Sequence, residues 1–160
     1  MKVGQVVECD FGLYKPDKHG KHHADGHIPP EMIKKRLAVL LNVKLGTGFV
    51  VVPLSSTQDV NKEQRGYHVK IDPAFVPQTA FWTPCDRWAK AELMQYVSLD
   101  RLFTMRDNNR NYVKRVLPRD LVADIQRAVM TVIGGAALLR PIEPPVQPPI
   151  PADPGNAEIA

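Results

Sequence analysis

The 160-residue sequence has few of the residues from which disulfide or metal scaffolds are built. Its two cysteines, Cys9 and Cys85, lie far apart and form no CxxC pair, which argues against a disulfide framework and a four-cysteine zinc site. It has no run of about 18 apolar residues, so we expect no membrane-spanning helix. The opening MKVGQVVECDFG carries charges where a signal peptide needs an apolar stretch. We therefore expect a soluble, cytoplasmic protein whose cysteines are buried as small apolar side chains.

The common enzyme signatures are also missing. No P-loop, GxGxxG, GxSxG or HExxH motif occurs, which argues against a nucleotide-binding protein, a hydrolase with a nucleophile elbow and a zinc protease. Four histidines gather in residues 19–27 (HGKHHADGH), but their spacing matches no tetrahedral zinc site. We predict no metal and no cofactor, and we interpret these histidines as solvated loop residues that contact phosphate when protonated.

Charge and proline divide the chain into two parts. Residues 141–160 hold seven of the fifteen prolines, three acids and no lysine or arginine. Successive prolines remove amide donors and hold the backbone extended, so we predict a disordered tail here, with a docking ligand as the alternative. Residues 1–140 then form a single domain with 21 basic and 14 acidic residues. This excess of positive charge suits a polyanionic partner such as nucleic acid.

Most of the predicted elements are strands. The opening VGQVVECDF alternates apolar Val7 and Cys9 with polar Glu8, which is typical of a half-buried strand. Two apolar runs joined by a glycine-containing turn predict a hairpin, and a third alternating segment puts His68 on its polar face. The predicted strands after the first are residues 37–43, 48–54, 66–72, 79–88 and 93–98.

The helical signals come late in the chain. Ser98 can cap a short turn, and Pro118 suits the first position of a helix. An apolar stripe that includes Leu121 and Ile125 follows, and glycines beginning at Gly134 end it. Such a stripe is typical of core or dimer packing. Several short strands before one helix predict a mainly β (α+β) fold, a small bent sheet or barrel with helical additions.

Two polar positions stand out at strand ends. Arg36 follows Lys34 and Lys35 and precedes an apolar strand, which places a guanidinium at the rim of the sheet. Such an arginine can fork onto a phosphate, although a solvated charge run beside a strand is the alternative. Ser55 and Ser56 end the paired strand, where a hydroxyl usually caps or makes a turn.

The order of these segments resembles the PemK/MazF family of toxin ribonucleases. The resemblance is carried by GQVVECDFG, KKRLAVLLNV, GFVVVPLSST, HVKI and CDRW followed by YVSLDRL, and it covers about residues 3–104. The loop at residues 12–35 resembles that of a longer-loop branch of the family, because it ends in a PPEM-like segment at residues 29–32. The resemblance implies an SH3-like barrel of five to seven strands with short helices and a C-terminal helix, and a helical part at about 105–137.

The resemblance also implies an activity and its residues. The implied activity is metal-independent cleavage of single-stranded RNA by its own 2′-hydroxyl, which leaves a 2′,3′-cyclic phosphate and a 5′-hydroxyl. Arg36 matches the family's catalytic arginine, and Ser55 falls where the family has a catalytic threonine or serine. Leu37 follows this arginine where the family usually has proline. His68 is expected to hold RNA, to transfer a proton, or to hold its loop through a hydrogen bond.

The sequence also suggests RNA contacts, partners and two alternative functions. Auxiliary RNA contacts are expected from Lys34, Lys35, Ser56, Arg65 and His68. Trp82 and Trp88 are predicted as core residues, with base stacking as the alternative. The implied partners are single-stranded RNA, an acidic antitoxin protein and a second copy of the chain in a homodimer. Two other functions stay open: a toxin that poisons a protein such as gyrase, and an inactive binding module of the same fold.

Overall fold

The computed structural model describes residues 1–13, 18–20, 27–43 and 45–139. Two of the loop histidines, His22 and His23, and the proline-rich tail 141–160 lie outside the described residues. The described strands and helices are β1 (Gln5–Asp10), β2 (Lys35–Leu40), β3 (Gly48–Ser55), α1 (Val60–Gln64), β4 (His68–Ile71), β5 (Arg87–Lys90), β6 (Gln95–Ser98), β7 (Leu102–Phe103), β8 (Met105–Arg106), β9 (Tyr112–Val113), β10 (Arg115–Val116) and α2 (Arg119–Val132). Four short 3-10 helices connect or follow them: η1 (Pro73–Phe75), η2 (Ala91–Leu93), η3 (Leu99–Arg101) and η4 (Gly135–Leu139).

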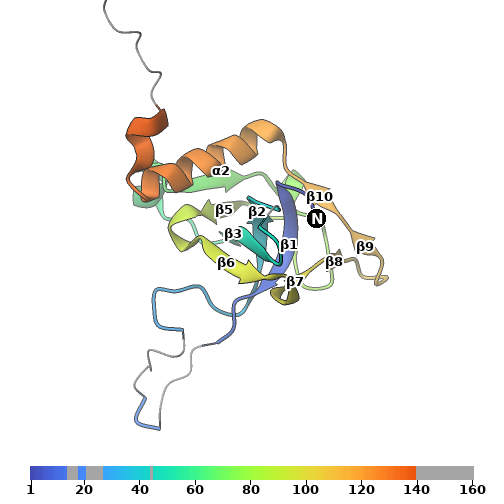
Figure 1. Ribbon diagram of the computed structural model, residues 1–160. Helices are drawn as coiled ribbons and strands as arrows, with labels where there is room; N and C mark the ends of the chain where they lie inside the picture. Colours follow the sequence, from blue (N-terminus) through green and yellow to red (C-terminus); the bar gives the residue numbers. More distant parts are fainter. Residues whose placement is uncertain (14–17, 21–26, 44, 140–160) are drawn as a thin grey trace, which may run out of the picture.

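Eight of these strands form one antiparallel sheet. Its order is β10-β1-β2-β3-β5-β4, with β6 paired to β3 and β7 paired to β1 (Figure 1). Strand β3 pairs with β6 through its first half and with β5 through its last two residues, so one strand joins two parts of the sheet and the sheet curves. The predicted mainly β, barrel-like fold is confirmed. The sheet has six strands of four or more residues, and β7 and β10 add two residues each.

The first strand is buried on both faces, so the expectation of a half-buried strand is wrong. Val6 belongs to one apolar cluster, with Leu37 and Ile125, and Val7 and Cys9 belong to another on the opposite face. Glu8 is only 6% exposed, and its carboxylate accepts a hydrogen bond from an indole nitrogen rather than facing water. The strand alternates in sequence, but neighbouring elements cover its polar face as well as its apolar one.

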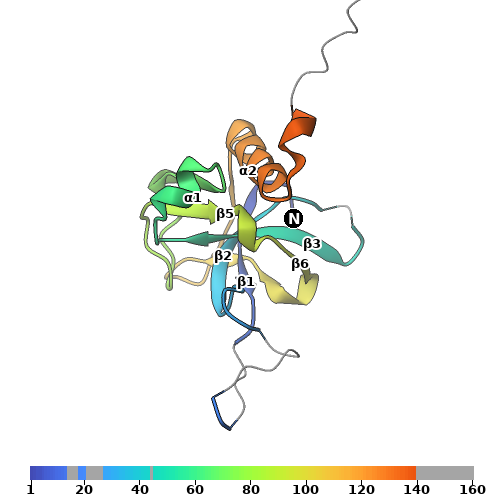
Figure 2. The same cartoon turned by 90° about the vertical axis from the view of Figure 1, so that its left-hand side faces the viewer.

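Helix α2 covers one side of the curved sheet. Val122, Ile125 and Ala128 are its buried residues, and Figures 1 and 2 both show the helix lying on the side away from the segment that leads into β2. Gly4, just before β1, has a φ of +79°, and a Cβ there would lie 2.7 Å from the Val122 side chain. Glycine therefore permits both the turn and the close approach of helix to strand. Pro118 is the cap of α2 rather than its first residue.

Two stretches differ from the sequence prediction. Within 79–88 the strand begins only at Arg87. The Thr79 hydroxyl accepts hydrogen bonds from the backbone amides of Phe81 and Trp82, and these bonds form a turn where the sequence predicts a strand. Residues 105–116, expected to be helical, instead form the short strands β8, β9 and β10 before α2 begins. The short helix α1 is absent from the prediction, because none of its residues is buried and no apolar stripe marks it.

Candidate functional site

The two residues expected to be catalytic come from neighbouring strands. Strands β2 and β3 pair antiparallel, with Ala38 opposite Pro53. The paired register ends there, and extending it by two residues places Arg36, near the start of β2, across from Ser55 at the end of β3. Directly opposite residues of an antiparallel pair point to the same face of the sheet. The sheet therefore brings Arg36 and Ser55 together although 18 residues separate them in the chain.

Both side chains line one cavity of about 230 Å³, which we call the arginine pocket. Its lining combines two arginines, three hydroxyl residues and three apolar or aromatic residues: Arg36, Arg87, Ser55, Ser56, Thr57, Met32, Leu54 and Trp82. Guanidinium groups present N–H donors in a fork that matches phosphate oxygens, and hydroxyls add neutral donors. The pocket is therefore suited to an oxyanion.

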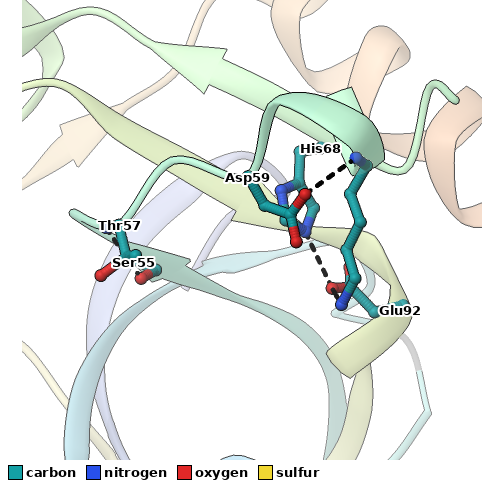
Figure 3. A network of polar contacts seen from close by, with 6 residues as sticks. Ser55, Thr57, Asp59, His68 and Glu92 are labelled. Carbon is teal, nitrogen blue, oxygen red and sulfur yellow. Dashed lines mark hydrogen bonds and ion pairs between the residues drawn. The ribbon is translucent and has the colours of Figure 1, made fainter. Parts of the chain in front are cut away.

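Local hydrogen bonds orient the side chains of Arg36 and Ser55. The Nε atom of Arg36 donates to the carbonyl oxygen of Ile33 at 3.3 Å, which fixes the side chain, and its two terminal nitrogens form no hydrogen bond within the described part of the chain. The Ser55 hydroxyl accepts from the Thr57 amide at 3.1 Å, which leaves the hydroxyl hydrogen available to donate (Figure 3). Both residues keep donors that a bound phosphate could use.

Arg87 is the site residue that the sequence prediction missed. Strand β5 pairs with β3 through Trp88 and Ser55, so the residue before Trp88 lies at the end of β3. Arg87 is 6% exposed as a residue. One of its terminal nitrogens donates to the Thr83 carbonyl at 3.4 Å, and its guanidinium lies 5.4 Å from the centre of the Trp82 ring. Its Nε atom is buried and has no hydrogen-bond partner among the residues that the structure describes.

The pocket carries uncompensated positive charge. Within the described ranges, no carboxylate lies within ion-pair distance of Arg36 or Arg87. A buried cation without a counter-charge is costly to desolvate, so such residues commonly mark places where a ligand supplies the opposite charge. Arg87 is buried and Arg36 is half-buried, and two guanidiniums without a counter-charge on one cavity point to an anionic ligand.

The structure separates the other expected RNA contacts from this pocket. Ser56 is in its lining, whereas Lys34 and Arg65 are exposed elsewhere, before β2 and at the end of α1. Lys35 points away from Arg36, because neighbouring residues of a strand face opposite sides. Its Nζ atom lies 3.5 Å from the Glu8 carboxylate.

His68 lies outside the arginine pocket. Its side chain is fully buried, so the exposure predicted from strand alternation is wrong; residues of α1 and η2 cover it. Its Nε2 atom is 2.8 Å from Oε1 of Glu92, and the Lys62 ammonium donates to the same oxygen at 2.9 Å (Figure 3). Figure 3 shows this cluster apart from Ser55 at the end of β3. The histidine thus serves as a structural tie between α1, β4 and η2.

Two titratable groups are shifted by their surroundings. Burial by itself raises the pKa of Glu92, but the hydrogen bonds from His68 and Lys62 outweigh it and hold the pKa below its ordinary value. Burial raises the pKa of the Cys9 thiol to about 12, against a smaller opposing effect of Arg101. The thiol is therefore protonated at neutral pH and is a poor nucleophile.

No three histidine, cysteine or carboxylate side chains among the described residues come together as possible metal ligands. In the same part of the chain, no helix has both the length and the apolar character needed to cross a membrane.

Two bacterial proteins without assigned function share much of this sequence. YifN of Escherichia coli (strain K12) is 46% identical over 142 residues, which cover 86% of this chain and 95% of YifN. An uncharacterized protein of Haemophilus influenzae (strain ATCC 51907 / DSM 11121 / KW20 / Rd) is 42% identical over 138 residues, which cover 86% of this chain and 93% of that protein.

Solved structures with similar folds are more distant. The Mycobacterium tuberculosis toxin MazF-mt6 superposes with a TM-score of 0.46 at 13% identity, over 65% of this chain and 91% of the toxin. An endoribonuclease from a mycobacterial species, solved in complex with its cognate antitoxin, superposes with a TM-score of 0.45 at 17% identity, over 84% of this chain and 95% of that chain.

The family match extends over most of the sequence. Residues 2–133 match the family described as PemK-like, MazF-like toxin of type II toxin-antitoxin system. The matched range includes the arginine pocket and helix α2. This chain belongs to the PemK-like, MazF-like family of toxins of type II toxin–antitoxin systems.

Proposed function

We propose that this protein is a metal-independent endoribonuclease that acts in the cytoplasm and cleaves single-stranded RNA in the arginine pocket. One observation carries the proposal: two guanidiniums without carboxylate partners among the described residues and three hydroxyl residues line a single cavity. This combination supports phosphate as the ligand, and membership of a toxin family supports RNA as the source of that phosphate.

The proposed reaction is an attack within the substrate. The 2′-oxygen of the RNA forms a bond to the neighbouring phosphorus, and the bond from phosphorus to the 5′-oxygen breaks. The 2′-hydroxyl proton passes to solvent, and the 5′-oxygen takes up a proton, so the products are a 2′,3′-cyclic phosphate and a 5′-hydroxyl. Single strands suit this chemistry, because their backbone can align the 2′-oxygen with the bond that breaks.

The protein's contribution is electrostatic. The described lining of the pocket includes no carboxylate and no imidazole, so its residues act chiefly on the charge that accumulates on the phosphorane. In this proposal Arg36 forks onto the equatorial oxygens, Ser55 donates its hydroxyl hydrogen to one of them, and Arg87 supplies a second cation. Removal of one such donor typically reduces the rate about 100-fold or more.

The test is digestion of a single-stranded RNA in the presence of EDTA, with identification of both new ends. Wild type should leave cyclic phosphate and 5′-hydroxyl ends, and Arg36→Ala and Ser55→Ala should each reduce the rate about 100-fold. Arg127→Ala and Thr131→Ala are matched controls, because both residues lie on α2 away from the pocket. Activity that disappears in EDTA, or that survives in both pocket variants, would refute the assignment.

The partners follow from the same proposal. We propose that the toxin is a homodimer and that its antitoxin is an acidic protein, since the chain has a net charge of +4. Light scattering should give about twice the chain mass of 17.9 kDa. A monomer at micromolar concentration would contradict the dimer without affecting the proposed chemistry.

A further inference from the structure

A second cavity, of about 640 Å³, lies beside the arginine pocket, and we call it the hairpin groove. Its lining residues come from the hairpin of β8 and β9, from β7 and from residues 80–81. The strands β7, β8 and β9 are labelled in Figure 1. Its volume is within the range of about 300–1,000 Å³ that is usual for ligand sites. The residues that matter below are Phe81, Phe103, Tyr112, Lys35, Arg106 and Arg110.

Three aromatic side chains of this groove are exposed. Phe81 is 80% exposed, Tyr112 is 65% exposed and Phe103 is 42% exposed. Isolated exposed apolar residues are common on protein surfaces, but three rings around one cavity form a patch. A partner that covers the rings would gain the free energy of burying them.

Cations accompany these rings. The Lys35 ammonium lies 4.3 Å from the centre of the Phe103 ring, and the Arg106 guanidinium lies 4.7 Å from the centre of the Tyr112 ring. Arg106 also donates to the Tyr112 hydroxyl at 2.8 Å. Arg110 adds a third positive charge, and within the described ranges neither arginine forms an ion pair.

The acids of the groove are engaged in internal contacts. Glu8 accepts from the indole of Trp82 at 2.9 Å and pairs with Lys35. Asp107 accepts from the backbone amides of Asn109 and Asn111, both at 2.8 Å, so its carboxylate holds the hairpin turn. The groove therefore offers aromatic faces and positive charge to a ligand.

The groove and the arginine pocket meet at Trp82, which lines the pocket and donates its indole N–H to Glu8 of the groove at 2.9 Å. Phe81 lines the groove and the next residue, Trp82, lines the pocket. An extended ligand with one phosphate in the pocket would therefore pass through the groove with its neighbouring units.

We propose that the hairpin groove binds the nucleotides that flank the cleaved phosphate of single-stranded RNA. The bases stack on Phe81, Phe103 and Tyr112, and the flanking phosphates are neutralised by Lys35, Arg106 and Arg110. Stacking on aromatic rings inside a positively charged channel is how proteins hold single strands without reading one particular sequence. This inference rests on the proposed function, because it takes RNA to be the ligand of the arginine pocket.

Charge favours RNA over a peptide as the occupant. The groove's two acids form internal contacts, its two arginines form no ion pair with a described residue, and flat rings match the flat faces of bases better than branched side chains. An acidic peptide is the competing occupant, and the test below includes one.

The experiment measures binding separately from cleavage. An RNA of about ten nucleotides, made resistant to cleavage by 2′-O-methyl groups, is titrated with wild type, Phe81→Ala, Tyr112→Ala and the double variant. Tyr96→Ala is the matched control, because Tyr96 is 63% exposed on β6 and outside the groove. The Kd should rise about tenfold for each groove ring removed and stay unchanged in the control. Melting temperatures establish that every variant is folded.

The outcomes separate the two claims. Equal RNA binding by all variants, or no RNA binding by wild type, would overturn the groove assignment. If wild type cleaves no RNA but its binding depends on the rings, the ribonuclease proposal fails and the groove assignment stands. If an oligoglutamate peptide binds through Phe81 and Tyr112 while the Kd for RNA is the same in wild type and in both variants, the groove is a peptide site and the inference is wrong.

Discussion

Arg87 is a buried residue, 6% exposed, and its guanidinium forms no ion pair with any described residue. Its only described hydrogen bond is a long one to a backbone carbonyl. Holding a charge in this position lowers stability unless a ligand arrives, because the desolvation cost is not offset by a counter-charge. Because Arg87 lowers the stability of the ligand-free protein, we expect it to act on a ligand.

Replacement of this side chain should therefore separate stability from activity. In Arg87→Met we expect an unchanged or higher free energy of unfolding, because a buried unpaired charge is removed, and RNA cleavage reduced about 100-fold. Urea titration and a cleavage assay measure the two quantities. Arg87→Lys is the companion variant and should retain part of the activity, since it keeps the charge but loses the fork. A marked loss of stability with full activity would show that Arg87 is structural.

Glu92 gives a pH-dependent prediction. Its pKa is lower in the folded protein than its ordinary value of 4.5, so its stabilising effect is complete above that value and is lost as the pH falls through the lower folded pKa. Glu92→Gln should lower the free energy of unfolding at neutral pH by about 1–3 kcal/mol, because His68 and Lys62 lose a charged acceptor.

The measurement is urea unfolding at a series of pH values. The difference between wild type and Glu92→Gln should narrow at acidic pH, where the carboxylate of wild type becomes protonated. Asp124→Asn is a control, since this exposed residue forms only a surface ion pair. A difference that stays constant from neutral to acidic pH would contradict the role assigned to Glu92.

Arg36 and Ser55 could be named from the sequence, because each adjoins an apolar strand and the family motifs are ordered along the chain. Their meeting in one cavity depends on the register of β2 and β3, which no local pattern specifies. Arg87 has no such local signal: its place depends on β5 pairing with the end of β3, a contact between distant segments. The burial of His68 likewise depends on α1, whose sequence carries no apolar stripe.

At the scale of elements, α2 completes the core. Ile125 is fully buried in the same apolar cluster as Val6 and Leu54 of the sheet. The helix and the sheet should therefore unfold together, in a single transition. The apolar periodicity of residues 121–132 predicted this helix, whereas the two-residue strands before it are set by pairing with β1 and with each other and leave no period in the sequence.

A substitution in α2 tests this coupling. Ile125→Ala should reduce the free energy of unfolding of the whole domain by about 2–5 kcal/mol, because it leaves a cavity in the core. Ile133→Ala, at a position 62% exposed just beyond the helix, should change it by less than about 0.5 kcal/mol. Both are compared at one protein concentration, since dimerisation would otherwise shift the result. Two separate transitions in wild type would contradict a single folding unit.

At the scale of the whole molecule, the positive charges of the pocket and the groove act together on RNA. Five cations line the two cavities: Arg36, Arg87, Lys35, Arg106 and Arg110. If each meets a phosphate, the logarithm of the binding constant for single-stranded RNA should fall against the logarithm of salt concentration with a slope of roughly −3 to −4. Binding that is insensitive to salt would contradict a phosphate-based interface.

The proline-rich tail lies outside the described residues, and its composition gives a separate prediction. A chain that ends at Leu139 should melt at the same temperature as the full chain and cleave RNA at the same rate, because residues 141–160 lack the aromatics and apolar periodicity needed to join a core. Differential scanning calorimetry and a cleavage assay check this. A melting temperature lowered by several degrees would place the tail in the folded domain.

The central claim is that the arginine pocket promotes attack by the RNA's own 2′-hydroxyl. The most direct measurement maps the cleaved bond in a defined RNA and then replaces only the attacking 2′-hydroxyl by hydrogen, with EDTA present throughout. We predict that the modified strand binds as tightly as the original and is not cleaved at that bond. Cleavage of the 2′-deoxy strand at an undiminished rate would contradict the account, because another nucleophile would then be responsible.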